Sequence, residues 1–560
     1  MAGGDYPVVG RVKPSATSYY PATHWWLWGG LALSVVFVLV AFPLLALLSQ
    51  VDLTRLTEPL TNPYLQRVIR FSLWQAFWST VLSVLLAIPL ATALSRRGRF
   101  PGRALLLNLF SVSLVIPSVV AVFGIVAVYG RTGWFNQGLA FMGMEARWSI
   151  YGMTGILLGH VFFNLPLATR VFLQSLDALP DTYWRLSAQL GMSARDGFLL
   201  LEWPAIKSQL AGIVLLVFSL CFTSFAIVMT LGGGPRATTI EVAIYQALRF
   251  DFDLAAAVSL ALVQLGICVL LVTVSHYYRV NTAVRLDTFS SRRRYGADSH
   301  WQRLCDALLI LFALVFVVTP LLALVVAAVN PALPTVLTHA RTLKAAFNTL
   351  WVALISGGLS VALALALLVS VRHLRVRLAR ESWSRVIEST GLLILVAPPI
   401  VLGTGLFILL RSRVDIFSAA LVIVILVNAL MSLPFVLRIL SAPMENNARR
   451  FDRLSVSLGI LGWSRWRLVE WPNLRRPLGL AMAVASTLSA GDLTVIALFG
   501  SERVATLPLL LFQRMGSYRL QEAAVTAFLL LLFCLLLFWT LERVIAGRQR
   551  AGPEPGADDA

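Results

Sequence analysis

The sequence predicts an all-α integral membrane protein with about twelve transmembrane helices, arranged as two tandem six-span repeats that form a pseudo-dimer. The first observation is composition: 58% of the 560 residues are hydrophobic and 13% are charged, with a mean hydropathy of +0.80. Soluble domains are about half apolar and about one quarter charged, so a soluble enzyme is excluded. The second observation is that the apolar residues form long uninterrupted runs. The third is an internal duplication of a loop together with its flanking spans.

Twelve apolar stretches are each long enough to cross a hydrocarbon core of about 30 Å. The first is preceded by a mostly polar segment and begins with Trp25, Trp26 and Trp28, which suit a membrane interface, so we do not interpret it as a cleaved signal peptide. The predicted spans are 25–48, 71–95, 104–130, 149–171, 206–231, 253–277, 304–329, 345–371, 387–410, 417–437, 477–500 and 521–541.

The positive charge of the chain predicts its orientation. The formal net charge is +19, and the basic residues concentrate in alternate short loops, for example Arg96–Arg97 and Arg292–Arg294. Because such loops stay in the cytoplasm, both termini are expected there. The same charge distribution accounts for the high isoelectric point without any binding of nucleic acid.

Two of the inner loops contain nearly the same string. Residues 185–204 and 453–472 are identical at nine of twenty positions with a constant offset of 268, and Pro166 matches Pro434 in the same register. The chain is therefore expected to contain two copies of a unit with six spans each. An even number of crossings gives both copies the same orientation, so a pseudo-two-fold axis along the membrane normal is expected, with a translocation path at the interface.

Each repeated loop is expected to form a helix, a tight turn and a second helix. Gly191 and Gly459 occupy the turn, where a left-handed backbone would favour glycine. Pro204 and Pro472 are expected to open the next helix, because the first helical residue has no intrahelical use for its N–H. Two rigid loops of this kind look like two docking points for a partner, whereas a solvated connector would not need the repeated Gly and Trp-Pro.

The spacing from Gly191 to Leu201-Glu202-Trp203-Pro204, repeated from Gly459 to Pro472, resembles the loop of binding-protein-dependent ABC importer permeases. That resemblance implies that each loop is a coupling helix seated in a groove of an ATPase subunit. The family often has Glu-Ala-Ala where this chain has Arg-Leu-Ser, so no salt bridge of that Glu is carried over. The coupling-loop residues so implied are Arg185, Leu186, Ser187, Gly191, Glu202, Pro204, Arg453, Leu454, Ser455, Gly459, Glu470 and Pro472.

Longer strings, such as GHVFFNLPLATR (159–170) and LGGGPRATTIEVAIYQAL (231–248), are similar to permeases of bacterial thiamine and thiamine pyrophosphate importers over about residues 65–545. The resemblance implies MetI-like repeats, an inner-membrane location, a partner ATPase in two copies and a periplasmic substrate-binding protein. Ferric-iron importer permeases share this architecture, so iron remains the alternative substrate. The implied divisions are an N-terminal segment (1–24), a first helix and outer loop (25–65), permease domain 1 (66–278), a basic linker (279–303), a seventh helix and outer loop (304–344), permease domain 2 (345–543) and a tail (544–560).

The motifs that the chain lacks also bear on function. It has no G-x-x-x-x-G-K-[ST] phosphate loop, and none of its three lysines follows a glycine. We therefore expect no catalytic residue and no cofactor in this chain, with ATP–Mg bound by the partner. The four cysteines lie within apolar runs without metal-ligand spacing, so no metal site is expected.

Two polar residues inside predicted spans, His160 and Asp492, are candidates for the pathway or a gate. The competing interpretation is a hydrogen bond between helices. An ion-coupled secondary transporter is the alternative class for the whole chain, but it would be expected to carry several acidic residues within its spans.

Overall fold

The computed structural model describes residues 25–50, 61–112, 115–144, 148–277, 299–378, 380–412, 415, 419–460, 462–501 and 504–547. These residues form helices joined by turns, and no strand occurs in the described ranges. The helices of the first half are α1 (Trp25–Ser49), α3 (Pro63–Arg96), α4 (Arg103–Val112), α5 (Ser118–Tyr129), α6 (Trp134–Phe141), α7 (Met153–Asp177), α8 (Asp181–Gln189), α9 (Ala194–Gly197), α10 (Trp203–Phe222), α11 (Ala226–Leu231), α12 (Ile240–Arg249) and α13 (Leu254–Tyr277).

The second half repeats this order. Its helices are α14 (His300–Ala328), α15 (Leu333–Thr338), α16 (Ala340–Arg372), α17 (Glu381–Val396), α18 (Pro399–Leu410), α19 (Ala420–Ser457), α20 (Gly462–Arg465), α21 (Trp471–Gly491), α22 (Thr494–Phe499), α23 (Leu507–Gly516) and α24 (Leu520–Ala546). Eleven described helical runs are long and apolar enough to span a membrane, and Pro399–Leu410 is a shorter apolar helix.

Four predicted spans are not continuous helices. The stretch 206–231 divides into α10 and α11, and 477–500 divides into α21 and α22, whereas the other two break at prolines. The stretch 104–130 divides into α4 and α5, with Pro117 at the break, and 387–410 divides into α17 and α18 at Pro398-Pro399. Proline lacks the N–H that a helix interior needs and clashes with the preceding turn, so both breaks occur at matched proline positions. The prediction of continuous spans there is wrong. Of the eleven described runs long enough to span a membrane, six lie in the first half and five in the second.

The helices after the coupling loops begin earlier than expected. Pro204 and Pro472 were expected to open them, but the backbone is already helical from Ala194 and Gly462. Each proline is the second residue of α10 or α21, directly after a π-helical turn, η1 (Phe198–Glu202) or η4 (Trp466–Glu470). The wider i→i+5 turn accommodates a residue that cannot donate an i→i−4 hydrogen bond.

The duplication predicted from sequence is confirmed by matched hydrogen bonds. The Ile240 N–H at the start of α12 donates to Ser72 Oγ at 2.9 Å. In the second half the Leu507 N–H at the start of α23 donates to Thr349 Oγ1 at 2.8 Å. In both halves a hydroxyl of the second span therefore holds the start of the short helix that precedes the sixth span.

The first helix of each half packs on the other half. α1 lies against α16 and α18, and α14 lies against α3 and α5. The two contacts are matched. A Cβ atom added at Gly405 would stand 2.3 Å from the carbonyl oxygen of Pro43, and a Cβ atom added at Gly124 would stand 2.5 Å from the carbonyl oxygen of Pro320. Each glycine allows two helix backbones to touch at a proline carbonyl, as small residues do in membrane bundles.

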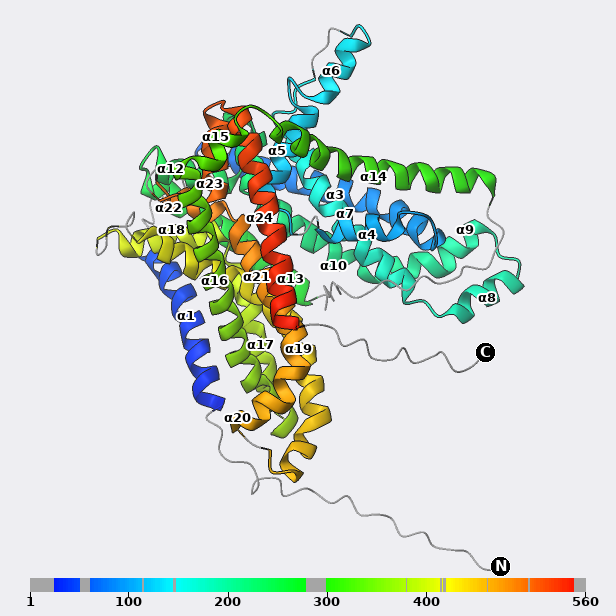
Figure 1. The fold of residues 1–560 in the computed structure, drawn as a ribbon, viewed down its shortest axis with the longest axis vertical. Coiled ribbons are helices and arrows are strands. Elements are labelled where there is room, and N and C mark those ends of the chain that lie inside the picture. The colour runs from blue at the N-terminus through cyan, green and yellow to red at the C-terminus, as the bar shows by residue number, and fades with distance from the viewer. Residues whose placement is uncertain are drawn as a thin grey trace, which may run out of the picture.

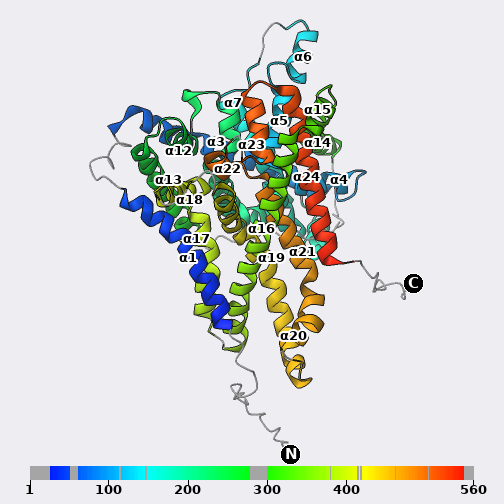
Figure 2. The ribbon, with the colours of Figure 1, turned by 60° about the vertical axis from the view of Figure 1, so that its left-hand side comes forward.

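The helices form two arms that meet at one end and diverge toward the other, and each arm includes the first helix of the opposite half. Figure 1 shows α3, α4, α7, α10 and α14 running to the right, whereas α1, α16, α19 and α21 run downward. Figure 2 shows the second set from another side, again extending down to α20. The two repeated loops, which include α8–α9 and α20, therefore lie far apart at the free ends of two arms (Figure 1).

Candidate coupling loops and the junction of the halves

Both repeated loops contain the same glycine turn. Gly191 has φ +62° and Gly459 has φ +65°, the left-handed conformation predicted for them. The residue after each glycine closes the turn: Met192 N–H donates to the Ser187 carbonyl at 3.1 Å and Ile460 N–H donates to the Ser455 carbonyl at 2.8 Å. Both hydrogen bonds are helix C-caps, and each one fixes where the helix before the turn ends.

The helix before each turn carries an exposed apolar face. Leu186 and Leu190 are 53% and 68% exposed, and the copy-matched Leu454 and Leu458 are 52% and 63% exposed. A spacing of four residues places each pair on one side of its helix. Arg185 and Arg453 are exposed as well, Ser187 is half-buried and Ser455 is buried. An apolar face at the tip of each arm is typical of a protein contact.

The two glutamates of the repeated motif do not belong to that face. Glu202 and Glu470 are both buried, whereas Pro204 and Pro472 are exposed. Glu202 Oε2 lies 3.3 Å from Arg96 Nη2, and Glu470 Oε1 lies 2.8 Å from Arg372 Nη1. Each glutamate therefore ties its loop to the end of the second span in the same half. From the sequence, Arg96 is attributed to topology, and neither of these two ion pairs is predicted.

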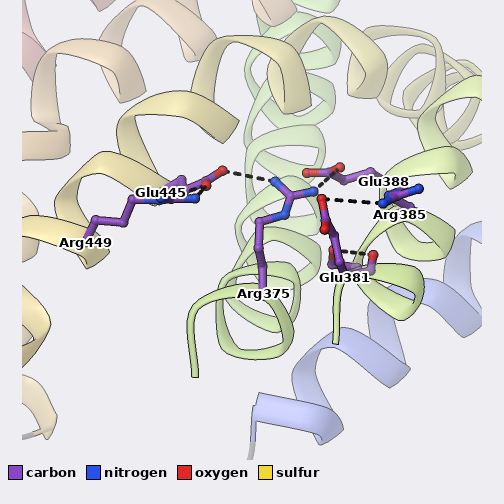
Figure 3. Close-up of polar contacts among 7 residues, drawn as sticks. Arg375, Glu381, Arg385, Glu388, Glu445 and Arg449 are labelled. Atoms are coloured by element: carbon purple, nitrogen blue, oxygen red, sulfur yellow. Dashed lines mark hydrogen bonds and ion pairs between the residues drawn. The ribbon is translucent and has the colours of Figure 1, made fainter. Parts of the chain in front are cut away.

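Further charges fix the loop end of the second half. Arg375 donates to Glu388 Oε2 at 2.6 Å and to Glu445 Oε2 at 3.0 Å, so it bridges α17 and α19 (Figure 3). Arg449 bonds Glu445 from one turn further along α19 at 2.6 Å. Closer to the loop, Arg465 contacts both Asp452 and Glu470. The last turns of α19 are thus held by two arginines from neighbouring elements, Arg375 and Arg465.

In the first half, the loop end of α3 forms ion pairs with a helix of the second half. Arg97 Nη2 lies 2.9 Å from Asp306 Oδ2, and Arg96 Nη1 lies 3.4 Å from Asp306 Oδ1. Asp306 is on α14, the first helix of the second half. A single buried acid therefore links α14 to the same arginine that holds Glu202.

His160 and Asp492 lie in different surroundings. His160 is 1% exposed, and its Nδ1 is 2.8 Å from Ser79 Oγ, which joins α7 to α3. Asp492 follows the end of α21, where its carboxylate accepts hydrogen bonds from the N–H groups of Thr494 and Val495 at 3.2 Å each. The structure thus places the histidine in a contact between two helices and the aspartate at the break between α21 and α22.

The helix breaks of the two halves meet. A Cβ atom at Gly491, the last residue of α21, would stand 3.0 Å from Pro117 Cβ, at the break before α5. Discontinuous helices at the interface of two repeats are typical of substrate sites in transporters. In the part of the chain that the structure describes, no group of three His, Cys, Asp or Glu residues is placed to hold a metal ion.

Comparison with known proteins decides the family. Residues 79–285 match the family described as "Binding-protein-dependent transport system inner membrane component". The thiamine transport system permease protein ThiP of Escherichia coli is 46% identical over 94% of this chain and 98% of its own length. ThiP of Brucella abortus is 43% identical over 93% and 96%. The chain belongs to this family of transport permeases. The permease is a multi-pass inner-membrane protein and a transport subunit, which removes the secondary-transporter alternative.

Proposed function

We propose that this permease is the translocation subunit of an ATP-driven importer for thiamine and thiamine pyrophosphate. The observation that carries the substrate is the full-length similarity to ThiP proteins at 43–46% identity. The two-armed structure supports the mechanism, since each arm ends in an apolar face beside a glycine turn. ATP–Mg is bound and hydrolysed by a partner, and this chain contributes no catalytic group, cofactor or metal.

The coupling loops are the docking sites for two ATPase subunits, one for each arm. Leu186 and Leu190 supply the apolar contact in the first half, as Leu454 and Leu458 do in the second. From each glycine turn one helical run continues to the junction, through η1 and α10 or through η4 and α21. Closure of the ATPase pair would bring the arms together, and these helices would carry the movement to the breaks at the junction.

The orientation follows from the basic residues. The loop ends of the arms and both termini face the cytoplasm, because the arginine-rich segments lie there. The opposite end, where the halves meet, receives the substrate-binding protein. Arms that diverge from that end correspond to a state open toward the cytoplasm (Figure 1).

The docking role of the loops is tested by charge insertion. The double variant Leu190→Asp/Leu458→Asp places a carboxylate in both apolar faces, and we expect co-purification of the ATPase subunit to fall at least tenfold, since truncation of an interface hot spot costs about 2 kcal/mol or more. The matched control Gln189→Asp/Ser457→Asp adds the same charges at neighbouring exposed positions and should retain the ATPase.

Membrane content of both variants is measured alongside, so that loss of binding is not confused with loss of the permease. Retention of the ATPase by Leu190→Asp/Leu458→Asp at normal levels of the permease would refute the docking role. Equal loss in both double variants would show that the apolar faces are not the contact.

A further inference from the structure

Two turns at the end where the arms meet carry exposed aromatic side chains. Phe252 lies between α12 and α13, and Tyr518 lies between α23 and α24. Their side chains are 82% and 88% exposed. Figures 1 and 2 place α12 and α23 far from α20, and Figure 1 places them far from α8 and α9 as well. Each half therefore presents one aromatic ring on the side of the molecule opposite to the coupling loops.

The two turns are matched in their backbone. The Ala257 N–H donates to the Asp253 carbonyl at 3.2 Å, and the Ala523 N–H donates to the Arg519 carbonyl at 2.9 Å. Both bonds form the first turn of the last span of their half, directly after the aromatic residue. The duplicated fold thus places the rings of Phe252 and Tyr518 at equivalent points of the two halves.

Both aromatic residues have an unfavourable backbone conformation. φ is +53° at Phe252 and +58° at Tyr518, and no other non-glycine residue in the described part of the chain has a positive φ. Glycine is the usual residue in such turns, because a left-handed residue with a side chain costs about 1–2 kcal/mol. Packing within the permease offsets little of this cost, since both side chains are largely exposed. A cost that recurs at equivalent positions indicates a function of the rings outside the fold.

The charges beside the two rings have opposite sign. The matched segments 249–254 and 515–520 contain one arginine and two aspartates in the first half and one arginine in the second, so their net charges are −1 and +1. Asp251 and Asp253 flank the first ring, Arg519 follows the second ring, and all three are exposed. Glu522 lies 3.7 Å from Arg519 Nη1 and closer, at 3.3 Å, to Arg514 Nε. The two turns are therefore alike in shape and opposite in charge.

We propose that these turns are the two contacts for the substrate-binding protein, with Phe252 and Tyr518 as anchors. Exposed aromatic residues are enriched at protein interfaces and often carry much of the binding energy. One partner that spans both halves would meet both rings. Its surface must be basic opposite Phe252 and acidic opposite Tyr518, so the charges fix its orientation on a pseudo-symmetric permease. This inference rests on the proposed function and extends it to the residues that dock the partner.

Anchoring in the membrane interface is the other role that exposed aromatic residues have in membrane proteins. An interface anchor can lie at any outward-facing position near the end of a spanning helix. It does not require a left-handed backbone, and it does not require opposite charges beside the two rings. Both features favour a protein partner, and the experiment below distinguishes the two roles.

The test measures the concentration of binding protein that half-maximally stimulates ATP hydrolysis by the full permease and its ATPase in nanodiscs. Phe252→Gly/Tyr518→Gly removes both rings and suits the left-handed backbone, so the denaturation midpoint should not fall. We expect the half-maximal concentration to rise at least tenfold, as on loss of an interface hot spot. Phe347→Ala removes an aromatic side chain that is 64% exposed on α16, and this control should leave the concentration unchanged.

The charges are tested by single reversals. Asp251→Lys and Arg519→Glu should each raise the half-maximal concentration about fivefold, and the effect should weaken as salt is added. Asp253 is not substituted, because its carboxylate accepts a hydrogen bond from the Ala256 N–H at 3.1 Å at the start of α13. Reversals without effect would show that the charges do not orient the partner.

The outcomes separate this inference from the proposed function. If thiamine-loaded binding protein does not stimulate the wild-type complex, the proposed function is wrong. If it stimulates the wild type and Phe252→Gly/Tyr518→Gly at the same concentration, the docking turns are wrong and the importer stands. An unchanged half-maximal concentration together with a lower membrane content of that variant would identify the rings as membrane anchors.

Discussion

Alanine at Gly405 is expected to lower the free energy of unfolding by about 2 kcal/mol or more, because its methyl group meets the backbone of α1. The added Cβ atom would stand 2.3 Å from the Pro43 carbonyl oxygen and 2.6 Å from the carbonyl carbon. A backbone cannot rotate away as a flexible side chain does, so α1 must move off α18. Gly124→Ala should have a similar effect on α14, since its Cβ atom would stand 2.5 Å from the Pro320 oxygen.

The measurement is the denaturation midpoint of the purified permease in detergent. Gly266→Ala is the matched control, because a Cβ atom there, also within a spanning helix, has no neighbour within 4 Å. Gly266→Ala should be neutral or slightly stabilising, as alanine is the better helix former. Equal midpoints for Gly405→Ala and Gly266→Ala would contradict the close packing of α1 on the second half.

The double variant Gly191→Val/Gly459→Val is expected to reduce thiamine uptake at least tenfold. At φ of +62° and +65° a β-branched residue is strained, and each left-handed residue costs about 1–2 kcal/mol, so both loops should open to another conformation. That change would shift the exposed leucines before each turn relative to the π-helical turns η1 and η4. It would also shift them relative to α10 and α21, the helices through which an ATPase would act.

Substitution by asparagine distinguishes the effect of backbone strain from the effect of replacing glycine by any other residue at these turns. It tolerates the left-handed region better than valine, so Gly191→Asn/Gly459→Asn should retain most of the uptake. Both variants are compared at equal levels in the membrane. Normal uptake by the valine variant would remove the glycine turns from the coupling mechanism, whatever the substrate.

The architecture was predictable because its signals are long or repeated. Apolar runs of about twenty residues identify spans without reference to tertiary structure. The constant offset between residues 185–204 and 453–472 identifies the duplication, and the glycine at each turn follows from backbone sterics. These features depend on local chemistry, so the sequence contains them directly.

Other features depend on partners that are distant in the chain. Nothing in the apolar run of α1 indicates that it packs on α16 and α18, because lipid and protein surroundings favour the same side chains. Arg96 suits a cytoplasmic loop whether or not it pairs with Glu202, so topology alone accounted for it.

Uptake of labelled thiamine at nanomolar concentration, in the native host with and without this gene, tests the central claim most directly. We predict that deletion abolishes high-affinity uptake and that the wild-type gene restores it, whereas Gly191→Val/Gly459→Val at the same membrane level does not. Uptake that is unchanged by deletion would contradict the account of the substrate and would make ferric iron the next ligand to measure.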